Sequence, residues 1–114
     1  MAFSEFERHL IEKEVGGFCS RRVPEHLKDK VRLEYDIEKQ DVIIYEVRPY
    51  WKDPKKHTRN PIAKLTYVKS QNIWKLYWQR ANGKWERYEP KESDKVLSVL
   101  VQEIDKDSHY CFFG

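Results

Sequence analysis

Three residues on predicted neighbouring strands carry the side chains that a metal-dependent phosphoryl transfer would need. Asp36 and Glu46 supply carboxylates, and Lys64 supplies a cation. Carboxylates at neighbouring strand ends can hold Mg²⁺, and a nearby cation can stabilise the charge of a phosphoryl transition state. Asp36, Glu46 and Lys64 are therefore the candidate catalytic residues of a metal-dependent, nuclease-like enzyme. The alternative interpretation is an ordinary cross-strand salt pair between Glu46 and Lys64.

Histidine and cysteine give no support to other chemistry. The four histidines are His9, His26, His57 and His109. They lack the spacing of metal ligands, and none accompanies a nucleophile in a hydrolase arrangement, so we expect no metal and no cofactor. The two cysteines, Cys19 and Cys111, are far apart in the chain and are expected to be free thiols. The sequence has no apolar run of about 18 residues and no secretion signal. Together with the free thiols, these features predict a cytoplasmic protein that does not enter a membrane.

The strongest functional signal is a basic, tryptophan-rich middle segment. Residues 48–87 contain eleven lysines and arginines, two acids and all four tryptophans. The segment thus carries a charge of +9 in a chain of net charge +3, and the flanks carry −6. Cations interleaved with aromatic rings suit the phosphates and bases of nucleic acid. Two alternatives remain: the segment is a solvated face neutralised by the acidic flanks, or it contacts another protein.

The prolines place part of this segment in a loop. Pro49, Pro54 and Pro61 interrupt residues 50–61, and proline cannot donate to a β-ladder, so we expect a long basic loop here. Further along, Asn82-Gly83 predicts a two-residue hairpin turn. That turn would set Arg80 opposite Trp85, and Trp78 opposite Arg87. Such a Trp–Arg square either stabilises the hairpin through cross-strand contacts or offers a surface on which bases can stack. The candidate binding residues on these two features are Arg48, Trp51, Lys55, Lys56, Arg59, Trp78, Arg80, Trp85 and Arg87.

The elements that must position these residues can be read from hydrophobic periodicity. Ser4 and Glu7 form a capping box for a helix over residues 5–15, which Gly16-Gly17 ends. Strands are expected over residues 30–38, 42–48, 61–69, 73–80 and 84–88. A second helix starts around residues 90–94, and the apolar tail 110–113 docks on the domain. We therefore predict one α+β domain, residues 1–114, with an antiparallel sheet of about five strands flanked by an N-terminal and a C-terminal helix.

Several short runs resemble a known family. They are Arg48-Pro49, Trp51, the run 61–67 (PIAKLTY), the run 76–78 (LYW) with Arg80, the run 83–85 (GKW), Tyr88 and the ending 112–114 (FFG). Together they resemble the bacterial domain-of-unknown-function family 3024 over most of the chain. The resemblance implies a shared fold and a bacterial origin, and it transfers no activity. The residues themselves favour a non-enzymatic binding module for nucleic acid or another polyanion, with a protein-interaction domain and a metal-dependent nuclease as alternatives.

Overall fold

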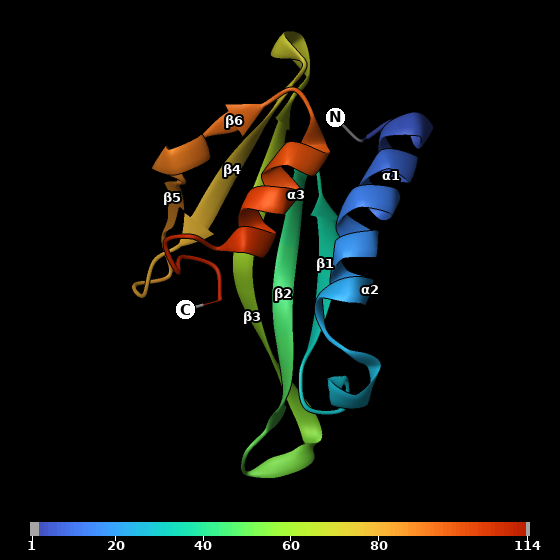
Figure 1. Ribbon diagram of the computed structural model, residues 1–114, viewed down its shortest axis with the longest axis vertical. Helices are drawn as coiled ribbons and strands as arrows, with labels where there is room; N and C mark the ends of the chain where they lie inside the picture. Colours follow the sequence, from blue (N-terminus) through green and yellow to red (C-terminus); the bar gives the residue numbers. More distant parts are fainter. Residues whose placement is uncertain (1–2, 114) are drawn as a thin grey trace.

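An antiparallel sheet carries all the helices on one of its faces (Figure 1). The computed structural model describes residues 3–113. The strands are β1 (Arg32–Glu38), β2 (Asp41–Tyr50), β3 (Asp53–Val68), β4 (Ile73–Gln79), β5 (Trp85–Arg87) and β6 (Ser93–Asp94). Their order is β1-β2-β3-β4-β5, and the short β6 pairs with β4 beside β5. The predicted α+β class, with an antiparallel sheet and a helix from each end of the chain, is confirmed.

The first helix is longer than its glycines suggest. The Ser4 capping box forms as predicted, with Glu7 N–H donating to Ser4 Oγ at 3.1 Å. However, α1 (Glu5–Ile11) runs through a π-helical turn (Glu12–Gly16) into α2 (Gly17–Arg22), so the predicted stop at Gly16-Gly17 is wrong. A Cβ at Gly16 would lie 3.4 Å from the Tyr35 ring. Glycine here lets the helix approach β1, and burial of its apolar stripe outweighs the glycine penalty of about 1 kcal/mol.

The core lies between this helix, α3 (Leu97–Lys106) and one face of the sheet. Ile11, Val15 and Phe18 meet Val42 and Ile44 of β2, all with less than one per cent exposed surface. From α3, Leu97, Leu100, Val101 and Ile104 pack into the same cluster. Both helices therefore bury their apolar stripes on one face, which leaves the other face of the sheet without a helix.

The C-terminal region differs from its prediction in two details. Residues 90–94 do not begin a helix; they form a 3-10 turn (Glu89–Lys91) and β6, because their backbone pairs with β4. The tail docks as expected, with Phe112 only 4% exposed. Its anchor is the buried Asp107, whose carboxylate accepts the backbone N–H of Phe112 at 3.0 Å and of Phe113 at 2.9 Å. Within residues 3–113, no helix has the length and apolar content needed to cross a bilayer.

Candidate nucleic-acid interface

The predicted basic loop is instead a β-hairpin arm. Strand β3 pairs with β2 through residues 57–61 and again at Asp53, next to a turn at Trp51-Lys52, so the prediction of a long loop is wrong. Residues 54–56 bulge out of this ladder at the register shift beside Pro49. The prolines are tolerated because Pro49 and Pro61 lie where the register shifts. Strand β1 pairs only up to Val47 and β4 only from Ala63, so neither covers this part of the hairpin. We call residues 48–60 the arm; Figure 1 shows it projecting beyond the helices.

The tip of the arm carries an exposed tryptophan among lysines. Trp51 is 80% exposed, and its ring centre lies 5.1 Å from Lys52 Nζ and 6.1 Å from the Tyr50 ring. Lys52, Lys55 and Lys56 are exposed as well, and none forms an ion pair with another residue in the range 3–113. The tip therefore offers an unpacked aromatic face next to cations that have no ion-pair partner in the described chain, and a ligand can reach both.

The two arginines of the arm are already paired, and they lie on opposite faces of it. Arg48 Nε donates to Glu46 at 2.9 Å on the helix side. On the other side, Arg59 donates to Asp36 at 3.0 Å and to Glu34 at 3.3 Å. The Arg59 guanidinium also lies 4.0 Å from the Tyr45 ring centre. Arg59 is therefore a bridge from β3 across β2 to β1, and its first role is to hold the arm to the sheet.

The same network perturbs a carboxylate of β1. The hydrogen bond from Arg32, at 2.8 Å, holds the pKa of Glu34 below its ordinary value, and Arg59 adds to this effect. Because both arginines contact Glu34, its negative charge is compensated in the folded state.

The register of the β4–β5 hairpin differs by one residue from the prediction. Its loop has three residues, Ala81-Asn82-Gly83, and Gly83 takes the left-handed φ of 84° that such a loop requires. Trp85 therefore lies opposite Gln79, and Trp78 lies opposite Glu86. A one-residue shift moves every side chain to the other face. The predicted Trp–Arg square does not exist: Trp78 and Trp85 project from opposite faces.

Each member of the predicted square has a different neighbour. Trp78 packs against the core on the helix side. Trp85 lies on the open face, where Lys64 Nζ is 5.2 Å from its ring and 4.8 Å from that of Tyr77. Arg80 pairs with Glu86 at 3.5 Å, and Arg87 with Glu92 at 3.9 Å. The hairpin cations are thus mostly engaged within the fold.

The basic segment is partly neutralised by the acidic flanks. Of its eleven cations, four form ion pairs with acids of the flanks, namely Arg48, Arg59, Lys69 and Arg87, and Arg80 pairs with Glu86 inside the segment. The other six are Lys52, Lys55, Lys56, Lys64, Lys75 and Lys84. Three of these six lie at the tip of the arm, which makes the tip the densest unpaired positive charge of the segment.

The candidate catalytic residues are not assembled into a site. Asp36 and Lys64 share the open face, but Ile43 of β2 stands between them in the register. Glu46 projects from the helix side, opposite Asn60, and binds Arg48. Residues 3–113 also hold no cluster of three or more His, Cys, Asp or Glu side chains able to share a metal ion. The Glu46–Lys64 salt pair is not formed either.

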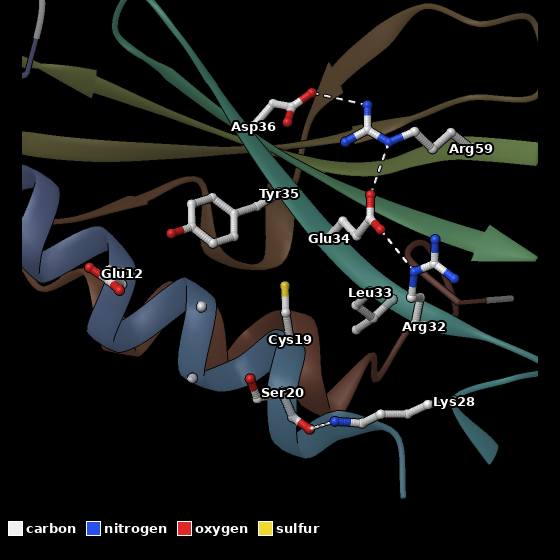
Figure 2. A pocket seen from close by; sticks show the side chains of 12 residues that line it. Glu12, Cys19, Ser20, Lys28, Arg32, Leu33, Glu34, Tyr35, Asp36 and Arg59 are labelled. Atoms are coloured by element: carbon white, nitrogen blue, oxygen red, sulfur yellow. Dashed lines mark hydrogen bonds and ion pairs between the residues drawn. The ribbon is translucent and has the colours of Figure 1, made fainter. Parts of the chain in front are cut away.

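A groove beside β1 was not predicted. It has a volume of about 630 Å³ and lies between the helix and the edge of the sheet, where Cys19 and Tyr35 face each other (Figure 2). Burial raises the pKa of the Cys19 thiol to about 12, with a smaller contribution from Glu34. Both cysteines are free, as predicted. The sequence signal for the groove was the Gly16-Gly17 pair, which marks a close approach of the helix to β1.

These features define a class: an α+β domain whose helices cover one face of an antiparallel sheet and whose longest hairpin extends as a basic, tryptophan-tipped arm. The sequence profile of the DUF3024 family, a domain of unknown function, matches residues 3–114. The chain therefore belongs to that family, as its residues suggested. No curated protein and no solved structure matches the chain.

Proposed function

We propose that this protein is a non-enzymatic binding module for single-stranded nucleic acid, which it contacts with the tip of the arm. The observation that carries the proposal is the 80% exposure of Trp51 beside three lysines that have no ion-pair partner in the described chain. The two free thiols favour a reducing compartment such as the bacterial cytoplasm.

The chemistry of the tip matches the two parts of a single strand. Unstacked bases present a π-face, and stacking on an aromatic side chain contributes about 1–3 kcal/mol per base. Lysines beside the ring neutralise phosphates and release the counterions condensed on them. An extended hairpin places both kinds of side chain outside the body of the domain, so a strand can approach them without a change in the fold.

The arm is a better site than the β4–β5 hairpin. Arg80 and Arg87 are paired with Glu86 and Glu92, and the Trp85 ring already has Lys64 beside it. Binding phosphate there would first break contacts within the protein. At the tip, no ion pair of the described residues has to be broken.

Equilibrium binding tests the proposal. Fluorescence anisotropy with labelled oligo-dT, its RNA counterpart and a duplex should show binding of single strands at micromolar protein and low salt. Simultaneous replacement of Lys52, Lys55 and Lys56 by alanine should weaken it at least tenfold. Arg59 is left in place, because its bonds to Asp36 and Glu34 make it part of the fold.

The matched control removes the same charge elsewhere. Lys13, Lys95 and Lys106 are exposed lysines outside the arm, and their joint replacement by alanine should leave affinity within about twofold. Absence of single-strand binding by the wild-type protein, or an equal loss in the control, would refute a specific role for the arm.

A further inference from the structure

The outer edge of β1 has no strand beside it. In the sheet order β1 comes first, and within residues 3–113 its only hydrogen-bonded neighbour is β2. Alternate residues of an edge strand point their N–H and C=O groups outward, where they can pair with another extended chain. Proteins block such edges with prolines, bulges or charged side chains. β1 has charged residues at alternate positions, but it contains no proline and pairs with β2 without a register shift.

A groove runs along this edge instead of a covering element. One wall is the helix, with Glu12, Gly16, Gly17 and Ser20, and the other is β1 from Arg32 to Asp36 (Figure 2). Its volume of about 630 Å³ falls within the usual range of ligand sites, about 300–1,000 Å³. The seven residues of β1 extend for about 23 Å, enough for a strand of similar length to lie beside them.

The surface of the groove suits the side chains of an extended peptide. Gly16 and Gly17 line the middle of the groove with helix backbone, where Tyr35 of β1 and the Arg21 guanidinium pack close to them. Leu33 and the thiol of Cys19 line the same region (Figure 2). Side chains of a bound strand alternate in direction, so every second one would enter this space.

The two ends of the groove carry opposite charge. Lys28 and Arg32 lie where β1 begins, and Glu12 and Asp36 lie toward the other end (Figure 2). Lys28 is paired with the exposed Glu25 at 3.3 Å, Arg32 with Glu34 at 2.8 Å, and Asp36 with Arg59 at 3.0 Å. Glu12 forms no ion pair with the residues that the structure describes. A complementary strand therefore has a basic side chain near Glu12, an acidic side chain that competes with Glu25 for Lys28, and small or apolar residues between them.

We propose that this groove binds a linear peptide segment of another protein by β-strand addition to the edge of β1. Strand addition between an edge strand and a helix takes its affinity from main-chain hydrogen bonds and its specificity from alternate side chains. A second copy of this chain fits less well. Its own helix overhangs its β1 in the same way (Figure 1), so two edges brought together would force the two helices into one space.

Synthetic peptides test the proposal through amide NMR spectra of the full chain. The acetylated and amidated peptides KTVTVTE and ETVTVTK carry one charge of each sign on the same face of the strand and suit the two possible strand directions. At least one should shift amide signals of residues 12–20 and 32–36, and leave those of the arm unchanged. The like-charged peptides KTVTVTK and ETVTVTE should bind about two- to fivefold more weakly, since each loses one exposed charge pair.

Backbone methylation separates strand addition from other binding. Two versions of the better peptide carry N-methyl groups either on the odd-numbered or on the even-numbered residues. One version should lose binding and the other should keep it, because only every second N–H faces β1. Equal binding by the two versions would overturn the proposal.

A blocked groove supplies the second check. Ser20 is exposed and lines the groove, so the tryptophan of Ser20→Trp should fill the groove and abolish peptide binding. Gln102→Trp, on the exposed side of α3, is the matched control and should bind normally. No shift with either mixed-charge peptide at millimolar concentration would refute the groove as a peptide site. A wild-type protein that sediments as a dimer with its β1 amides protected would assign the edge to a second copy instead.

Discussion

Lys52 Nζ lies 5.1 Å from the centre of the Trp51 ring, at the turn that joins β2 to β3. The contact is intramolecular, but both side chains remain exposed to solvent. A cation over an exposed ring contributes only about 0.5–1 kcal/mol, so a base that stacks on Trp51 has only this weak contact with Lys52 to displace. This pair is the part of the molecule best arranged to meet a ligand without rearrangement.

Trp51→Ala should separate binding from stability. Because the ring is 80% exposed, its loss should leave the melting temperature within about 2 °C of wild type. Single-strand affinity should fall by about 1–3 kcal/mol, or roughly 5- to 150-fold. Phe6 is 78% exposed on α1, and Phe6→Ala is the matched control that should change neither quantity. A Trp51→Ala protein with unchanged affinity would remove the ring from the binding site.

The two tryptophans of the β4–β5 hairpin should differ in urea denaturation. Trp78 packs against the core, so Trp78→Ala should lower the free energy of unfolding by about 3 kcal/mol. Trp85 lies on the open face with Lys64, so Trp85→Ala should cost less, about 1 kcal/mol. Similar costs of about 3 kcal/mol for both substitutions would place Trp85 on the helix side with Trp78, as a two-residue loop requires, and would contradict the three-residue loop.

The carboxylate of Glu34 should contribute to acid sensitivity. Its pKa is lowered in the folded protein, first by the hydrogen bond from Arg32. The stability it provides is therefore fully present above the ordinary glutamate pKa of about 4.3, and it is lost as pH falls through the lower, folded-state pKa. Unfolding by urea at a series of acid pH values should show a shallower loss of stability for Glu34→Gln. Parallel curves for the two proteins would show that Glu34 has the same pKa in both states.

Native thiol labelling should distinguish the two cysteines. With a pKa of about 12, Cys19 is thiolate at pH 8 in only about one molecule in ten thousand. Cys111 is half-buried near the tail and should react with a disulfide reagent first, whereas both should react quickly in denaturant. Faster native labelling of Cys19 would show that the groove opens in solution.

Local patterns were sufficient to predict the elements but not their register. The alternation of Leu33, Tyr35 and Ile37 identified β1, and the spacing of Leu97, Leu100, Val101 and Ile104 identified α3, because each pattern reports which face is buried. Gly83 has a positive φ in both a two-residue type I′ turn and the three-residue loop, so the Asn82-Gly83 pair does not determine the loop length; the difference lies in Asn82, whose φ is not positive here. That single residue reassigned the faces of Trp78 and Trp85.

The remaining errors arise from tertiary context. Proline cannot donate to a central ladder, but Pro49 and Pro61 occupy register shifts, Pro49 lies beyond the end of the β1 ladder, and β4 does not reach Pro61. Gly16 and Gly17 would end an isolated helix, yet contact with β1 carries the helix onward. Trp51, Lys55 and Lys56 were identified from composition alone. Ion pairing removed Arg48 and Arg59 from the set of freely available cations. Lys52 joins Lys55 and Lys56 at the tip because it lies exposed in the turn and forms no ion pair in the described chain.

The salt dependence of binding tests the central claim most directly. Each phosphate neutralised on a single strand contributes about −0.7 to the slope of log affinity against log salt concentration. If Lys52, Lys55 and Lys56 each contact a phosphate, replacing all three by alanine should make the slope shallower by about 2, while the Lys13, Lys95, Lys106 control keeps the wild-type slope. Equal slopes for the wild-type and arm variants would show that the arm does not bind the nucleic-acid backbone, and would contradict the proposed function.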